Sequence, residues 1–274
     1  MTIWICSTCG VEHPDTARPP RDTCRICADD RQWVPVDGQH WTTAGELDAE
    51  EHRVESEELR PGLHRFHRQP SFGIGQWSHL VRTPDGNLLW DPPNHLAPEL
   101  VAEIEGLGGL SVVVASHPHM FGCQVGWSRR FGDVPVLVHS ADREWVQRDD
   151  PVITEWRGVE TVLPGVTLIE VGGHFPGAAV AHVTSPDGRG DLLVGDSIMP
   201  TPATGWVTFL RSYPNGIPLS PALVRRIVDA LEPYEFDRMY GLAGRAVLTG
   251  AKDAVHRSAD RYIAWVSGEN DPLG

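Results

Sequence analysis

The sequence predicts an α/β layered sandwich that follows a small zinc ribbon. From Phe66 onward, about two hundred residues contain many short apolar strands with only a few helical segments between them, which is the pattern of a layered α/β domain. Several of these strands end directly before histidine or aspartate. Ahead of them, four cysteines lie in two closely spaced pairs, the arrangement of a thiolate metal site. These observations together predict a metalloprotein.

Length and composition place the chain among globular proteins. Its 274 residues are enough for one large domain and a small appendage. No apolar run approaches the ~20 residues that a membrane helix needs, and the start of the chain lacks the pattern of an export signal. We therefore expect a cytoplasmic protein without a membrane partner. The formal net charge of −14 disfavours nucleic acid as a partner, which leaves a small-molecule substrate.

The first four cysteines predict a structural zinc site in a ribbon that spans residues 1–36. Cys6 and Cys9 form one C-x-x-C pair, Cys24 and Cys27 form another, and fourteen residues separate the pairs. Two such pairs supply the four thiolates of a tetrahedral zinc site. Disulfides are the alternative, but a reducing cytoplasm disfavours them. Because the four sulfurs fill the coordination sphere, we expect this zinc to supply folding free energy rather than chemistry.

The ribbon carries arginines and carboxylates in similar numbers, so it offers no basic surface for nucleic acid. We expect it to dock on its own catalytic domain or on a protein partner, including a second copy of the chain in a homo-oligomer. Residues 37–62 follow as an acidic stretch with few apolar positions. This composition predicts a solvated helix and linker rather than a core element.

Residues 63–274 are predicted to form the main domain. Its predicted helices show apolar residues at helical spacing or start at a capping residue, as they do at Ser140 and Ser220, and they cover residues 93–106, 140–147, 220–231 and 251–266. Its predicted strands are short apolar runs bounded by turn residues, and they cover residues 72–82, 88–91, 112–115, 134–139, 159–163, 166–171, 178–184, 191–195 and 236–240.

Three strand ends carry the candidate ligands of the main domain. His117 and His119 follow the buried strand 112–115, and because alternate residues of an extended segment point to the same side, we expect both imidazoles to face one point. His174 and Asp196 follow two later strands, each after glycine, which lets the backbone turn sharply. Imidazole and carboxylate groups that converge at strand ends suit a metal ion.

These motifs resemble those of the metallo-β-lactamase-fold superfamily, in the same order from about Phe66 to the C-terminus. The resemblance rests on the LLWD run that ends at Asp91, the H-x-H block, the histidine of GGHFPG and the aspartate after Gly195. It implies an αββα sandwich with the metal site at the strand ends. It also implies that the main metal site consists of His117, His119, His174 and Asp196.

The sequence departs from the family motif H-x-H-x-D-H where the second metal would bind. Phe121 occupies the aspartate position, Gly122 occupies the last histidine position, and residues 240–244 lack the closing histidine of the family. In the family, these residues build the second metal position. The resemblance therefore implies a single zinc or iron ion in the main domain.

The retained ligands leave three interpretations open. If Asp196 binds loosely, a water takes the fourth position beside three imidazoles, its pKa falls to roughly 7, and the chain is a metallo-hydrolase, which is the function that we predict. A set of His117, His174 and Asp196 would instead suit iron, and the superfamily's persulfide dioxygenases are similar in this respect. The third interpretation is a non-catalytic member of the fold that binds a ligand or a protein partner.

Other side chains are candidates for supporting roles. In the family the lost aspartate orients the nucleophile, so another group has to help, and the candidate catalytic residues are Asp196, Cys123, His139 and Tyr213. The aromatic segment after Asp196 is expected to border the site, and its candidate substrate-binding residues are Trp206, Arg211 and Tyr213. Core packing is the alternative role for the aromatic residues.

Overall fold

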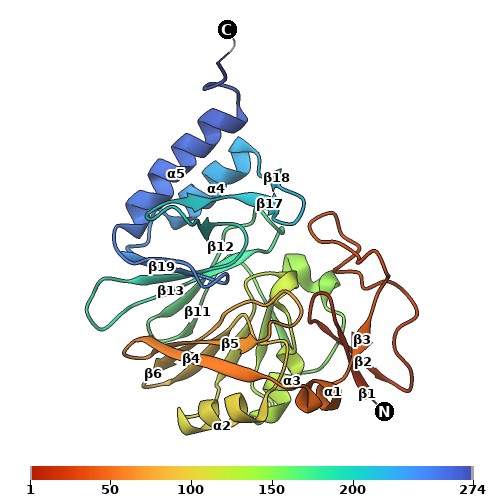
Figure 1. Ribbon diagram of the computed structural model, residues 1–274. Coiled ribbons are helices and arrows are strands. Elements are labelled where there is room, and N and C mark those ends of the chain that lie inside the picture. Colours follow the sequence, from red (N-terminus) through yellow and green to blue (C-terminus); the bar gives the residue numbers. More distant parts are fainter. Residues whose placement is uncertain (1, 273–274) are drawn as a thin grey trace. The chain divides into compact units, whose positions relative to one another are not determined.

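The computed structural model describes residues 2–272 and divides into two compact units, Met1–Trp156 and Arg157–Gly274. The first unit contains a three-stranded sheet and a seven-stranded sheet, and the second contains a six-stranded sheet that is followed by the last helix of the chain (Figure 1). Two mixed sheets with interposed helices are typical of the metallo-β-lactamase sandwich, so the predicted fold class is confirmed. The domain boundaries given above remain predictions.

The N-terminal sheet has the strand order β2-β1-β3, and its strands are β1 (Thr2–Cys6), β2 (Glu12–Thr16) and β3 (Trp41–Thr42). Strand β1 pairs antiparallel with both neighbours. Helix α1 (Ala44–Ala49) follows, and it begins with a capping box in which Thr43 and Glu46 each accept a backbone N–H from the other. The four cysteines lie at the end of β1 and in the turns around this small sheet.

The acidic stretch 37–62 differs from the predicted helix and linker. Only α1 is helical, and β4 (Arg53–Arg60) pairs antiparallel with β5 (Leu63–Gln69) as the edge strand of the seven-stranded sheet. A strand at a sheet edge needs few apolar residues because one face of it is solvated, and charged side chains there discourage pairing with other chains. The low apolar content of this stretch therefore fits an edge strand as well as a linker.

The seven-stranded sheet has the order β10-β9-β8-β7-β6-β5-β4. Its remaining strands are β6 (Ser78–Thr83), β7 (Gly86–Trp90), β8 (Val112–Val114), β9 (Val136–His139) and β10 (Ile153–Trp156). The strands from β4 to β7 are antiparallel, whereas those from β7 to β10 are parallel. The helical segments of this half are α2 (Pro98–Gly106), η1 (Pro118–Met120), α3 (Gln124–Arg130) and η2 (Ser140–Trp145). Parallel strands bring their carboxyl ends to one edge, and His117 follows β8 at that edge.

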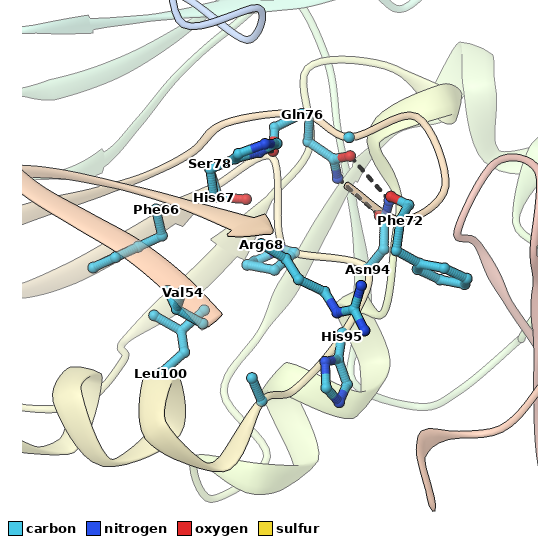
Figure 2. A pocket seen from close by; sticks show the side chains of 13 residues that line it. Val54, Phe66, His67, Arg68, Phe72, Gln76, Ser78, Asn94, His95 and Leu100 are labelled. Carbon is cyan, nitrogen blue, oxygen red and sulfur yellow. Dashed lines mark hydrogen bonds between the residues drawn. The ribbon is translucent and has the colours of Figure 1, made fainter. Parts of the chain in front are cut away.

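A small cavity lies in the first unit, between β5, the loop after it and the start of α2 (Figure 2). Its volume is about 30 Å³, which is enough for a water molecule and too little for a substrate. Beside it, Gln76 and Asn94 exchange two amide hydrogen bonds of 2.8 and 3.0 Å, and Gln76 also donates to the carbonyl of Pro92. These bonds hold the segment 92–94 in place.

The six-stranded sheet has the order β11-β12-β13-β14-β19-β20. Its strands are β11 (Val159–Leu163), β12 (Val166–Glu170), β13 (Ala179–Val183), β14 (Asp191–Val194), β19 (Arg238–Gly241) and β20 (Ala246–Val247). Only β14 and β19 pair in parallel. Two short ribbons, each of two strands, complete the unit: β15 (Met199–Pro200) with β16 (Val207–Thr208), and β17 (Leu210–Ser212) with β18 (Ile217–Pro218).

Helices α4 (Pro221–Leu231) and α5 (Ala251–Val266) pack against each other and share a buried apolar cluster with the six-stranded sheet. The Ser220 hydroxyl accepts the N–H of Leu223, so the predicted N-cap of α4 is confirmed. Helix α5 begins and ends at the predicted residues. Among residues 2–272, no helix has both the length and the apolar character that a membrane crossing requires.

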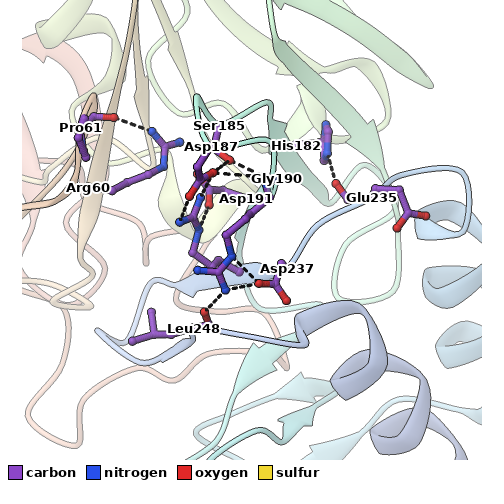
Figure 3. Close-up of polar contacts among 12 residues, drawn as sticks. Arg60, Pro61, His182, Ser185, Asp187, Gly190, Asp191, Glu235, Asp237 and Leu248 are labelled. Carbon is purple, nitrogen blue, oxygen red and sulfur yellow. Dashed lines mark hydrogen bonds and ion pairs between the residues drawn. The ribbon is translucent and has the colours of Figure 1, made fainter.

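A buried ion pair connects the two parallel strands of the second sheet (Figure 3). Arg238 Nε lies 2.6 Å from Asp191 Oδ1, and the Asp191 side chain has no exposed surface. The same guanidinium donates to both carboxylate oxygens of Asp187, at 2.8 and 2.9 Å. These hydrogen bonds raise the pKa of Arg238 against the effect of burial and keep the guanidinium charged.

We expect Asp191→Ala to lower the free energy of unfolding by about 1.5–3 kcal/mol, because it removes the buried hydrogen bond to Arg238 Nε while Asp187 still pairs with the guanidinium. The exposed Glu232, which lies 3.2 Å from His256, provides the control, and Glu232→Ala should cost less than about 1 kcal/mol. Urea unfolding of both variants measures the difference. Equal transition midpoints for the two variants would contradict this assignment.

Candidate metal centre

The first pair of ligands lies directly after the buried strand β8. His117 is 2% exposed and His119 is fully buried, and their ring centroids are 5.1 Å apart. His117 is extended, with φ of −171°, but His119 lies in the 3-10 turn η1 rather than in the predicted extended segment. Pro118 is the reason, since its fixed φ suits the first position of a helical turn. The imidazoles nevertheless come close together, as the H-x-H spacing predicts.

Hydrogen bonds from the end of β7 orient His117. Asp91 follows β7 with a left-handed φ of 52°, and its Oδ1 accepts the N–H of Ser116 at 2.7 Å. The Ser116 hydroxyl in turn lies 2.9 Å from His117 Nδ1. With Nδ1 occupied, His117 offers Nε2 to a metal. The role of Ser116 has no signal in the sequence other than its position beside the histidine.

The second pair of ligands belongs to the second unit. His174 Nε2 lies 3.4 Å from Asp196 Oδ2, and the two side chains are 1% and 10% exposed. His174 Nδ1 lies 3.2 Å from the carbonyl oxygen of Leu210, which again leaves Nε2 for a metal. Gly172 and Gly173 both have a positive φ, 67° and 85°, so the two glycines before His174 make the sharp turn that the sequence predicts.

His117 and His119 of the first unit and His174 and Asp196 of the second are candidate ligands of one metal ion, and all four residues are buried. Three nitrogen donors and one carboxylate oxygen suit zinc or non-haem iron. Buried imidazoles and a buried carboxylate are costly unless an ion or hydrogen bonds compensate them.

The position of the lost family histidine is sterically closed. Gly122 has a φ of 49°, and a Cβ on it would lie 2.5 Å from the Pro92 carbonyl oxygen and 2.8 Å from Asn94 Oδ1. Both atoms belong to the segment that Gln76 holds in place beside the cavity (Figure 2). Any side chain larger than that of glycine therefore collides with a fixed wall. Phe121, at the aspartate position, is 3% exposed and offers no ligand atom.

The four N-terminal cysteines form the second candidate metal group. Their sulfurs lie within 4.8 Å of one another, with 3.6 Å between Cys6 and Cys27 and 3.7 Å between Cys9 and Cys24. All are buried free thiols. Hydrogen bonds from neighbouring thiols lower the pKa of Cys24, whereas burial raises the pKa of Cys9 well above its usual value. The two C-x-x-C motifs therefore come together as predicted, and they offer four sulfur ligands to one metal ion.

The chain is similar in sequence to a protein of Bacillus subtilis. No known protein-family model matches the chain. The uncharacterized protein YmaE of Bacillus subtilis is 38% identical over 275 aligned positions, which cover 98% of each protein. The chain belongs to the family of YmaE. The name of YmaE assigns it no activity.

Solved structures show that this YmaE-family chain has the metallo-β-lactamase fold. A metallo-β-lactamase of Cronobacter sakazakii, described by its HARLDQ motif, superposes with a TM-score of 0.53 at 20% identity, over 82% of this chain and 96% of that one. The structure of VMB-1 superposes with a TM-score of 0.60 at 12% identity, over 78% of this chain and 98% of that one. At these identities the likeness concerns the fold and not the reaction.

The candidate supporting residues occupy different surroundings in this YmaE-family member. The Tyr213 hydroxyl donates to the backbone oxygen of Asp196 at 3.2 Å, and burial raises the pKa of Tyr213 well above its usual value. Burial likewise raises the pKa of Cys123, whose thiol donates to the Asn94 carbonyl. His139 accepts the N–H of Ala141 and is the N-cap of η2, the position that the sequence pattern assigns to Ser140. The bond from Tyr213 is to the backbone of a candidate ligand residue, Asp196.

The candidate substrate-binding residues have different surroundings. Trp206 stacks with arginines of α5, with the guanidinium of Arg261 3.5 Å and that of Arg257 5.5 Å from the ring centroid. Arg211 is half-buried in β17, beside Leu210, whose carbonyl contacts His174. The contacts of Trp206 are those of a packed surface residue, whereas Arg211 follows Leu210, whose carbonyl contacts His174, and Tyr213 donates to the Asp196 backbone. A role for these residues in substrate binding remains a prediction.

Proposed function

We propose that the chain is a metal-dependent hydrolase that uses a single ion held by His117, His119, His174 and Asp196. Two observations support it: each unit carries a buried pair of candidate ligands, and a side chain at Gly122, where the family motif has a ligand of the second ion, would collide with Pro92 and Asn94. A divalent ion in such a set lowers the pKa of bound water to roughly 7 and so supplies a nucleophile at neutral pH. We propose zinc for this ion and for the cysteine cluster.

The residues of the chain orient the ligands. Ser116 and the carbonyl of Leu210 occupy Nδ1 of His117 and His174, so that Nε2 of each ring is presented to the ion. We propose that the substrate approaches beside Asp196, because its side chain is 10% exposed whereas that of His174 is 1% exposed. The substrate class that fits is a small molecule with an electrophilic carbonyl, such as an ester, a thioester, a lactone or an amide.

A related protein gives the proposal a precedent in the motif. The Cronobacter sakazakii structure carries the letters HARLDQ, and its description calls it a metallo-β-lactamase. That motif also ends without histidine. We propose by analogy that an altered six-residue motif is compatible with hydrolysis in this chain. We also propose that the chain works in the cytoplasm, where the cysteine thiols stay reduced.

Metal analysis combined with a hydrolysis survey tests the proposal. The purified chain is assayed against chromogenic esters, thioesters, lactones and β-lactams, beside His117→Ala and the control His256→Ala, whose histidine is 41% exposed and lies outside the ligand set. We expect His117→Ala to lose one ion and to lower kcat/KM on the order of 10³-fold, with the control unchanged. An iron ion with oxygen consumption would favour the oxygenase instead. A histidine set that holds no ion in the wild type would favour a binding protein.

A further inference from the structure

The ribbon reaches the histidine ligands through Gln32. The side-chain amide nitrogen Nε2 of Gln32 lies 3.2 Å from His119 Nδ1, and the two residues are 8% exposed and fully buried, respectively. Residue 32 belongs to the predicted ribbon, 87 positions before its partner. Neither the fold family nor the sequence motifs assign a function to this residue.

Two sets of contacts anchor the segment that carries Gln32. Cys27 belongs to the cysteine cluster, and the turn after it closes with a hydrogen bond from the Gln32 N–H to the Asp29 carbonyl at 3.1 Å. The Arg31 guanidinium pairs with Asp29 and lies 5.3 Å from the ring centroid of Trp145 in η2. The position of the Gln32 amide therefore depends on the cysteine cluster and on the main sheet together.

A second contact fixes the ribbon to the loop after His119. The Glu12 carboxylate, only 3% exposed, accepts the Val125 N–H at the start of α3 and pairs with Arg148 at 2.5 Å. The Glu12 N–H donates to the carbonyl of Gly122 at 3.0 Å. The ribbon thus contacts the loop that carries the candidate ligands at His119 and at Gly122.

The three histidines share one arrangement around Nδ1. Ser116 lies against Nδ1 of His117, the Leu210 carbonyl against that of His174, and the Gln32 amide against that of His119. A ring that binds a metal through Nε2 carries its proton on Nδ1 and needs an acceptor there. In the structure the Gln32 amide nitrogen faces the ring, and a 180° rotation of the amide, which exchanges its nitrogen and oxygen, supplies this acceptor.

We infer that Gln32 is a positioning residue that orients His119 for metal binding, so that the cysteine ribbon is a functional part of the histidine centre. This inference rests on the proposed metal centre but not on its hydrolytic activity. Loss of such an outer hydrogen bond typically weakens metal affinity 10–100-fold. A carboxylate at position 32 would accept the Nδ1 proton at least as well as an amide does.

Cobalt(II) binding to the full chain tests the inference, because thiolate-to-cobalt charge transfer reports the cysteine cluster alone. The variants are Gln32→Leu, which keeps the size of the side chain, Gln32→Glu as the rescue, and Gln147→Leu as a control whose amide donates to Trp145 instead. We expect Gln32→Leu to weaken only the sulfur-free site by about 10–100-fold. Gln32→Glu should restore its affinity, and the control should match the wild type.

Three results would overturn the inference. If Gln32→Leu binds cobalt at the sulfur-free site within twofold of the wild type, Gln32 does not position His119. If Gln32→Leu weakens both sites equally, or Gln32→Glu fails to rescue, Gln32 serves the folding of the ribbon instead. If the wild type itself shows only the sulfur site, the proposed metal centre fails along with the inference, and that result appears without any variant.

Discussion

Replacing Cys24 with serine is expected to remove one metal ion per chain and to unfold the N-terminal segment. Structural zinc contributes about 10–16 kcal/mol of apparent binding free energy in isolated zinc fingers, and the three-stranded sheet of this segment is too small for a core that could replace it. We therefore expect rapid proteolysis within residues 10–40, detected by mass spectrometry after limited digestion. Metal analysis of the same sample measures the lost ion.

The fifth cysteine provides the matched control for this prediction. Cys123 is buried like the other four, but it lies outside the cluster and donates to the Asn94 carbonyl. A serine at position 123 can make the same hydrogen bond, so Cys123→Ser should keep both the ion and the resistance to protease. If Cys24→Ser retains its ion and digests no faster than Cys123→Ser, the cysteine cluster is not a structural metal site.

Restoring the family motif with Phe121→Asp and Gly122→His is expected to destabilise the chain without adding a second ion. A side chain at a left-handed position costs roughly 1–2 kcal/mol, and the collision with Pro92 and Asn94 adds about 1–3 kcal/mol of overpacking. Gly122→His alone should therefore lower the free energy of unfolding by about 2–5 kcal/mol, and replacing the buried Phe121 with a carboxylate should add a loss of about 3–5 kcal/mol. Urea unfolding and metal analysis of the double variant measure both effects.

Gly132 separates the two contributions. It also has a positive φ, 85°, but a Cβ on it meets nothing within 4 Å. Gly132→Ala should therefore show the backbone cost alone, and Gly122→Ala should exceed it by the cost of the collision. Equal losses for the two alanine variants, or an additional ion in the double variant, would show that the second position is open.

Much of the metal centre follows from local sequence. The apolar strand before His117 and the paired glycines before His174 are short-range features, and they predict which residues end at the carboxyl edges of the strands. The sequence also predicts the absence of a second position, because Phe121 and Gly122 replace ligands of the family motif. The structure adds the physical reason, which is the wall at Pro92 and Asn94.

Features that depend on distant partners could not be predicted in this way. No motif marks Gln32 in the sequence, and its contact with His119 arises only when the ribbon packs on the sheet. Strand β4 has the composition of a linker because its charged face is solvated at a sheet edge. His119 departs from the extended segment because Pro118 starts a helical turn, a choice that the spacing of the histidines does not determine.

Metal analysis of the wild type beside two variants tests the central claim most directly. We predict two ions per wild-type chain, one ion in His117→Ala, and in Cys24→Ser one ion that the histidine centre holds more weakly because Gln32 is lost with the ribbon, with the cobalt-thiolate absorption lost only in the cysteine variant. This outcome assigns one ion to the histidine centre and one to the cysteine cluster. Three ions in the wild type, or two that disappear together in His117→Ala, would contradict a centre with a single metal.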